Sequence, residues 1–125
     1  MKNRIEHEVF KDYLEVRLYG VIDPEVEKEE AMARWTKIVA LCERENRKKA
    51  LVISYFKGVY KINTSFTLVE NANNLGWNLD YKLAMAVPDE DRFNRLLFIE
   101  NAMIQYGYDM KLFRSKREAK KWLLS

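Results

Sequence analysis

The chain has 125 residues and a formal net charge of +3, and 48% of its residues are hydrophobic, among them three Trp, six Phe and seven Tyr. A chain of this length can bury one substantial core, and its composition excludes a disordered or fibrous protein. Neither the small net charge nor any motif favours nucleic acid as a partner. We therefore expect one globular domain that spans residues 1–125.

Cysteine usage and the length of apolar runs bear on the compartment. The lone Cys42 has no internal disulfide partner, and no leader-like apolar run precedes a small-residue cleavage site. The longest apolar runs, 50–53 and 83–87, are far shorter than the roughly 20 residues that a membrane-spanning helix needs. We expect a cytoplasmic protein that does not insert into a membrane.

The first two predicted elements form an antiparallel β-hairpin. Residues 5–10 and 13–22 are typical of strands, and a tight turn at Lys11 and Asp12 joins them. Apolar and charged residues alternate along the second strand, with Leu14, Val16 and Leu18 against Glu15 and Arg17. This alternation predicts one apolar face for the hairpin.

A long helix is predicted next. Asp23 is typical of a helix N-cap, and Pro24 suits the first helical position because its missing N–H would have no helical partner there. Residues at helical spacing are expected to cover the sheet, namely Met32, Trp35, Val39 and Cys42. Glu30 and Arg34 are spaced for an i, i+4 ion pair on another face of this helix.

The middle of the chain predicts a buried strand and a second helix. Residues 50–56 are β-rich and apolar on both faces, as in a central strand that helices cover. A helix is expected to begin near 63–65, with Phe66, Val69 and Ala72 on its inner face. Gly76 supplies its predicted end.

Two further strands and two further helices complete the pattern. The strands are expected at 81–87 and 109–113. The helix between them ends at Gly107, and the inward residues are expected to be Phe93, Leu96, Leu97, Met103 and Ile104. Ser115 and Glu118 predict a capping box for the last helix, from which Ala119, Trp122 and Leu123 pack inward. The order ββαβαβαβα predicts an α/β domain, its sheet mostly parallel with an N-terminal antiparallel hairpin and covered by helices.

This order, together with residues 16–23, 83–102 and 106–123, resembles the STAS-like family, which includes SpoIIAA-like proteins and is related to anti-sigma-factor antagonists. The matching residues are Gly20 before Asp23, then Phe98, Glu100 and Asn101 before Gly107, and finally Phe113 before Glu118, Ala119, Trp122 and Leu123. The resemblance covers nearly the whole chain. It implies a regulatory module that binds another protein, in a signalling or stress-response pathway.

The resemblance also points to the start of the second helix. In signalling members of the family, a partner kinase phosphorylates a Ser there, within a motif of the Asp-Ser-Ser-Gly type. The matching stretch is 62–67, where Asn63 stands near the Asp position and Phe66 replaces the Gly. Thr64 and Ser65 occupy the hydroxyl positions, so the resemblance implies that they are the candidate phosphoacceptors.

The residues themselves leave three functions open for this stretch. Asn63, Thr64 and Ser65 are all preferred helix caps. With Lys57 and Lys61, the backbone donors of a helix start would also attract an anion or an acidic partner. Capping, a partner or anion surface, and phosphorylation therefore remain alternatives.

No catalytic constellation is evident in the sequence. Cys42 lies on the apolar stripe of the first helix, which predicts a core thiol and not a nucleophile activated by His7. One Cys and one His cannot assemble the usual zinc ligands, and the acidic run 89–91 is expected to favour the dipole of the following helix more than to bind a cation. We expect no enzyme, no metal and no cofactor.

A different class of function remains as the alternative. The domain would carry or sense a small apolar or anionic ligand, held between the helices and the sheet. Aromatic residues that could line such a pocket are Trp35, Trp77, Phe93 and Trp122, although the same residues suit an ordinary core. A homodimer is also compatible with the sequence.

Overall fold

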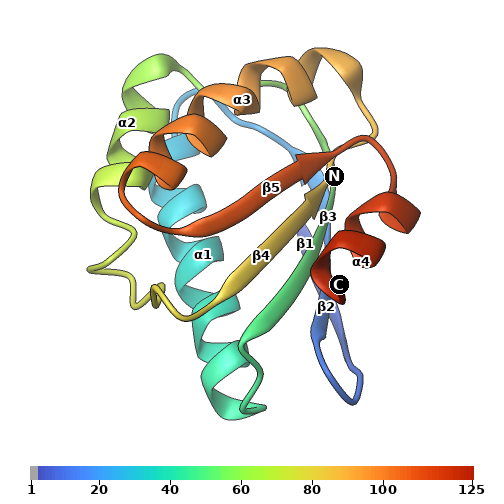
Figure 1. Cartoon of the computed structure of the whole chain (residues 1–125). Helices are drawn as coiled ribbons and strands as arrows, with labels where there is room; N and C mark the ends of the chain where they lie inside the picture. Colours follow the sequence, from blue (N-terminus) through green and yellow to red (C-terminus); the bar gives the residue numbers. More distant parts are fainter. Residues whose placement is uncertain (1–2) are drawn as a thin grey trace.

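A computed structural model describes residues 3–125, and its elements follow the predicted order (Figure 1). The strands are β1 (Arg4–Val9), β2 (Leu14–Val21), β3 (Lys49–Lys57), β4 (Lys82–Ala86) and β5 (Asp109–Phe113). The helices are α1 (Glu27–Arg44), α2 (Ile62–Glu70), α3 (Glu90–Gln105) and α4 (Lys116–Leu123). The predicted α/β fold class is confirmed.

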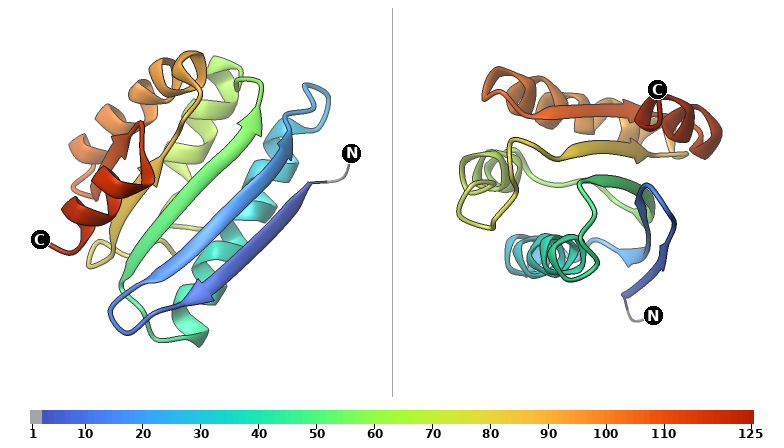
Figure 2. Two further views of the ribbon diagram at one scale, coloured as in Figure 1. Left: turned by 90° about the vertical axis from the view of Figure 1, so that its right-hand side faces the viewer. Right: turned by 60° about the horizontal axis from the view of Figure 1, so that its bottom comes forward.

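The sheet has the order β1-β2-β3-β4-β5, which confirms β3 as the central strand. β1 pairs with β2 in antiparallel orientation, and the other pairs are parallel. Helices α1, α2 and α3 cover one face of the sheet, and α4 lies on the other face (Figures 1 and 2). Two cores result, a large one beneath the three helices and a small one beneath α4.

The two faces of β2 bury different kinds of side chain. Leu14, Val16 and Leu18 belong to the large core, as the alternation predicts. Glu15 points to the other face, where it is 1% exposed and accepts a hydrogen bond from Arg17. Lys116 Nζ lies 3.2 Å from Glu15 Oε1, so this carboxylate links β2 to the first turn of α4.

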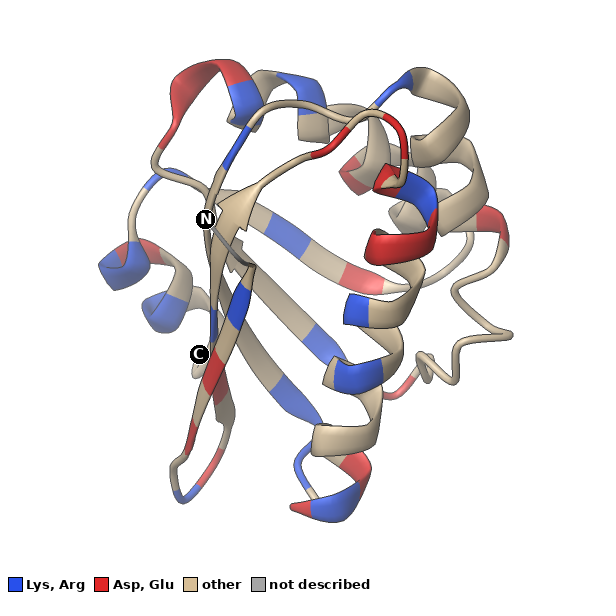
Figure 3. Ribbon diagram, turned by 180° about the vertical axis from the view of Figure 1, so that it is seen from behind, with Lys and Arg blue, Asp and Glu red and all other residues tan. Residues whose placement is uncertain are grey.

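Charges of both signs cover the surface that α1 and the hairpin present. Figure 3 shows acidic and basic residues interspersed along these elements. On the hairpin, Arg17 lies within 4 Å of carboxylates on Glu6 and Glu8 as well as Glu15. Charged side chains of this kind discourage an exposed edge strand such as β1 from pairing with another chain.

The start of α1 differs from the prediction. Asp23 is not the N-cap, because its Oδ1 accepts from the backbone N–H of Glu25 at 3.0 Å and closes a local turn. The helix begins at Glu27, and its N-cap Val26 makes no side-chain cap. A short polar side chain can bond to the backbone two residues on, and here that turn displaces the helix start.

The caps of α3 and α4 follow local sequence signals. Ser115 Oγ accepts from the backbone N–H of Glu118 at 3.2 Å, which confirms Ser115 as the predicted N-cap. The carboxylate of Glu118 accepts from the Ser115 hydroxyl at 3.2 Å instead of from its backbone N–H, so the reciprocal half of the predicted capping box takes a different form. Asp89 caps α3 by accepting from the N–H groups of Asp91 and Arg92. Gly107 ends α3 with φ of 93°. No helix within residues 3–125 combines the length and the apolar character that crossing a bilayer requires.

Candidate functional site

The structure divides the predicted partner or anion surface into exposed and buried residues. Lys57, Lys61 and Asn63 are exposed. Thr64 and Ser65 are only 4% and 8% exposed, so the predicted exposure of the two hydroxyls is wrong. The reason is that α2 already begins at Ile62, which turns both side chains toward the interior.

The predicted capping of α2 by a hydroxyl or amide is also wrong. Its N-cap is Lys61, which makes no side-chain cap. The buried carboxylate of Glu27, on α1, accepts from the backbone N–H of Lys61 at 2.8 Å. Lys61 Nζ in turn donates to the carbonyl of Pro24 at 2.9 Å. An internal carboxylate therefore lies where the helix dipole favours negative charge.

Exposed apolar side chains gather where α2 and α3 meet. Ile62, Phe66 and Phe98 are 71%, 48% and 42% exposed, and we call them the α2–α3 aromatic surface. The rings of Phe66 and Phe98 meet edge to face, with centroids 5.0 Å apart. The inward orientation predicted for Phe66 is therefore wrong, because the inner face of α2 is formed by other residues, including Leu68 and Val69.

A cavity of about 70 Å³ lies between the sheet and the layer of α1, α2 and α3. Its wall is almost entirely apolar, and residues from the sheet and all three helices contribute, including Leu18, Trp35, Leu68, Met85, Leu96 and Met103. Trp35 and Trp77 line this cavity as expected, with ring centroids 6.0 Å apart. Phe93 and Trp122 do not line it.

Two buried arginines provide the charged part of the cavity wall. Arg34 on α1 is 6% exposed, and Arg92 on α3 is 3% exposed. Their Cζ atoms lie 4.3 and 5.7 Å from the centroid of the Phe56 ring. Arg34 donates to the hydroxyl of Tyr60, and Arg92 Nη1 donates to the carbonyl of Gly58 at 2.9 Å. Aromatic and neutral groups therefore surround both guanidinium groups.

Neither guanidinium group forms a salt bridge within residues 3–125. The salt bridges of this part of the chain involve other residues. The Nε atoms of Arg34 and Arg92 are buried without a hydrogen-bond acceptor. Burial lowers the pKa of Arg92, and the like charge of Arg34 lowers it further, while Tyr60 and the carboxylate of Asp89 raise it. Two like charges thus share a dry environment, which is energetically unfavourable.

Sequence reasoning missed both arginines, although a signal was present. Arg34 was assigned to an exposed pair with Glu30, but it lies between Ala31 and Ile38 on the buried stripe of α1. Arg92 precedes Leu96 by four residues on the buried stripe of α3. An arginine in phase with buried apolar residues is the pattern that would have found them.

Gly20 makes room for the aromatic ring on which Arg34 stacks. A Cβ atom at position 20 would lie 2.6 Å from Cε1 of Phe56 and 2.1 Å from Oδ1 of Asn3. The φ of Gly20 is also 150°, a value that other residues rarely adopt. Only glycine therefore leaves room for the ring of Phe56 next to β2.

The other chemical candidates occupy separate places. Cys42 is 1% exposed, and burial, assisted by the charge of Glu43, raises its pKa to about 11. The prediction of a core thiol is confirmed. His7 is exposed on β1, with Nε2 3.5 Å from Nη2 of Arg44. Across residues 3–125, no three His, Cys, Asp or Glu side chains converge as metal ligands.

Comparison with known proteins bears on the fold. No family model matches the chain, and no curated protein matches its sequence significantly. The structure is similar to that of an uncharacterized DUF3478-family protein from Shewanella loihica PV-4, which has a SpoIIAA-like fold. The two sequences are 18% identical, the TM-score is 0.52, and the alignment covers 97% of this chain and 93% of that chain. The anti-sigma factor antagonist SpoIIAA in its unphosphorylated form aligns at 12% identity and a TM-score of 0.49, over 95% and 96% of the two chains. The likeness to the Shewanella loihica protein shows that the chain has a SpoIIAA-like α/β fold, as the sequence predicted.

Proposed function

We propose that this domain is a non-enzymatic regulatory module that binds another protein through the α2–α3 aromatic surface. The observation that carries the proposal is the solvent-exposed contact between Phe66 and Phe98, next to Ile62. Exposed aromatic clusters of this kind commonly anchor protein interfaces, where the rings enter apolar pockets of the partner. Lys61 and Asn63 are exposed beside them and would form part of a polar rim.

The SpoIIAA-like fold supports a regulatory role by analogy, and the pathway would be one of signalling or stress response. Phosphorylation of Thr64 or Ser65 stays a proposal. Because both side chains are buried, a kinase could reach them only if α2 moved away from its neighbours. A phosphate added there would then oppose the return of α2, because its charge would be desolvated on burial. A cytoplasmic location also stays a prediction.

The test is to identify a partner and then measure its affinity. A native pull-down from the source cell with mass spectrometry supplies the candidates. Titration then compares the wild type with Phe66→Ser and Phe98→Ser, each of which should weaken binding about tenfold or more. Leu124→Ser is the control, because Leu124 is similarly exposed but follows α4 on the opposite face. Unchanged affinity in both Phe variants would overturn the proposal.

The cavity favours a second candidate function, which is the carriage or sensing of a small ligand. Its apolar wall and its position between three helices and the sheet are typical of small-molecule sites. Toluene is a suitable neutral probe, with binding followed by the fluorescence of Trp35 and Trp77. A saturable change that is lost when Leu68→Trp fills the cavity would support this function. A wild type that shows no saturable change would contradict it.

A further inference from the structure

The most unusual feature of the cavity is its pair of buried guanidinium groups. A buried arginine is normally paired with a carboxylate, because an isolated charge is costly to remove from water. Arg34 and Arg92 reach the same cavity from α1 and α3 and lack such a partner within residues 3–125. Within this part of the chain, the hydrogen bonds that the two guanidinium groups donate go to the Tyr60 hydroxyl and the Gly58 carbonyl, while the charge of Asp89 acts on Arg92 without forming a salt bridge.

We propose that this cavity binds a small organic carboxylate, with the carboxylate held between Arg34 and Arg92 and the apolar group enclosed by the cavity. The inference rests on the second candidate function and specifies its ligand. A carboxylate has two oxygens and several acceptor sites, which suit the planar fork of a guanidinium group. It would supply the negative charge that the two arginines lack.

The arginines are positioned before any ligand arrives. Arg34 is held by the Tyr60 hydroxyl and by the face of Phe56, and Arg92 is held by the carbonyl of Gly58. In each case the Nε atom is left without an acceptor. Tyr60 accepts from Arg34 and keeps its own proton available for donation. Fixed donors with free N–H groups lose little conformational entropy on binding, which favours affinity.

The apolar part of the cavity wall limits the size and chemistry of the ligand's apolar group. Apart from Arg34, Arg92 and Tyr60, the cavity is lined by aliphatic, aromatic and methionine side chains. The volume of about 70 Å³ is several times what one enclosed water needs, but it is too small for a long acyl chain. A single ring or a chain of a few carbon atoms fits this space. Benzoate and butyrate are therefore the probes of choice.

A purely structural role for the arginines makes a different prediction. If they serve only to stack on Phe56, then the carboxylate of a probe should add nothing to its affinity. The matched pair of benzoate and benzyl alcohol separates the two roles, since both carry the same ring and only benzoate is charged. Inorganic phosphate tests whether charge alone suffices, and benzylamine tests the sign of the charge.

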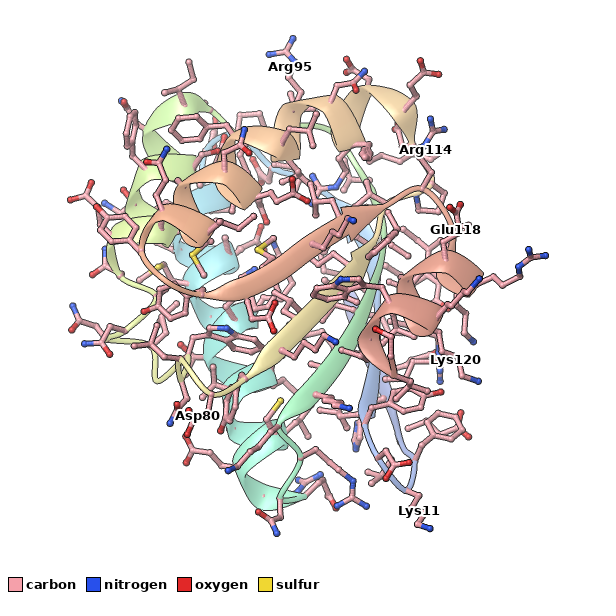
Figure 4. All side chains as sticks on the ribbon, in the orientation of Figure 1. Lys11, Asp80, Arg95, Arg114, Glu118 and Lys120 are labelled. Atoms are coloured by element: carbon pink, nitrogen blue, oxygen red, sulfur yellow. The ribbon has the colours of Figure 1, made fainter. Side chains whose placement is uncertain are left out.

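The experiment is a calorimetric titration of the full chain at low salt, since salt screens ion pairs. We expect benzoate or butyrate to bind at least tenfold more tightly than benzyl alcohol, benzylamine or phosphate. Arg34→Met and Arg92→Met should each lower the affinity for the carboxylate at least tenfold. Arg95→Met is the control, because Arg95 lies on α3 only three residues from Arg92 and points away from the molecule (Figure 4).

A second measurement needs no variant and covers the case in which a substitution prevents folding. The Nε–H resonances of Arg34 and Arg92 in the wild type should shift on addition of benzoate, and that of Arg95 should not. Binding of toluene and benzyl alcohol without a preference for benzoate would overturn the carboxylate inference and leave the ligand-binding function standing. If no probe binds, then both fail. If phosphate binds as tightly as benzoate, the apolar wall contributes nothing to affinity, and the proposed preference for an organic carboxylate is wrong.

Discussion

The two faces of the sheet both bury charge, but they accommodate it in different ways. On the face that carries α4, the buried carboxylate of Glu15 is paired with Arg17 and approached by Lys116. On the face that carries α1, α2 and α3, Arg34 and Arg92 are buried against Phe56 and form no salt bridge within residues 3–125, and the buried carboxylate of Glu27 bonds instead to the backbone N–H of Lys61. The first arrangement pairs its charges directly, and the second leaves both guanidinium groups without a salt bridge.

This difference separates two physical roles of a buried charge. The partners of Glu15 come from β2 and α4, so this ion pair joins parts of the fold. The guanidinium groups raise the energy of the folded state, because no salt bridge within residues 3–125 offsets their desolvation. A bound anion would lower that cost on the helix-covered face.

The largest loss of stability is expected for a substitution that displaces the ring of Phe56, which lies on the helix-covered face. Gly20→Ala should destabilise the domain by about 3 kcal/mol, because the new Cβ would overlap Phe56 and Asn3 and because φ is positive. Gly107→Ala is the control. It shares a positive φ, but its Cβ would meet nothing closer than 3.7 Å, so about 1 kcal/mol is expected. Urea denaturation measures the free energy of unfolding of both variants. Equal losses of stability would show that the ring of Phe56 can move aside at little energetic cost.

Substitution of one arginine on each face tests the comparison directly. Arg17→Met removes a partner of Glu15 and should cost about 2 kcal/mol, because a buried carboxylate then depends on Lys116 alone. Arg92→Met removes an unpaired charge and should change the stability by less than about 1 kcal/mol in either direction. The free energies of unfolding give the answer. A larger loss for Arg92→Met than for Arg17→Met would contradict the distinction.

The pH dependence of the unfolding free energy measures how unfavourable a negative charge on Cys42 is within the helix-covered core. Its pKa is about 11 in the folded chain against an ordinary value of 9.0, so the folded state disfavours the thiolate. The resulting stability is fully present below pH 9 and is lost as the pH rises toward 11. The wild type should therefore lose on the order of 1 kcal/mol more than Cys42→Ala between pH 7 and pH 10. Parallel curves for the two proteins would refute this.

The smallest loss of stability is expected for a substitution at the N-cap of α4. Ser115→Ala should destabilise the domain by about 1 kcal/mol, since the N–H of Glu118 loses its acceptor at the start of α4. Chemical denaturation measures this loss, provided that the slope of the unfolding free energy against denaturant concentration is unchanged. Lys121→Ala is a control on the same helix, and it should change stability by less than about 0.5 kcal/mol. No difference between the two variants would mean that the cap contributes nothing.

The fold could be predicted because its signals are local. The predicted strand at 109–113 is β5, and the capping of α4 involves residues only three positions apart. The buried central strand β3 is apolar on both faces, which a short window of sequence reveals. Strand and helix order then fix a largely parallel sheet with few alternatives.

The candidate site could not be predicted because it depends on distant contacts. The N-terminus of α2 bonds to Glu27, which precedes Lys61 by 34 positions, and a local pattern of hydroxyl residues cannot reveal such a distant cap. Phe66 meets Phe98 from another helix instead of entering the core. Arg34 is in phase with the buried residues Ala31 and Ile38, but its spacing also suits an ion pair with Glu30, and the sequence does not show that the ring of Phe56 receives its guanidinium group.

The shortness of α2 has a consequence for communication across the domain. Its nine residues make about 2.5 turns, so the helix moves as one rigid body. Leu68 and Val69 on its inner side form part of the cavity wall, while Ile62 and Phe66 on its outer side face solvent. Any displacement of α2 therefore alters both sides at once. If a small molecule binds inside and a protein binds outside, each would change the affinity of the other by the same factor, and α2 would couple the two binding equilibria.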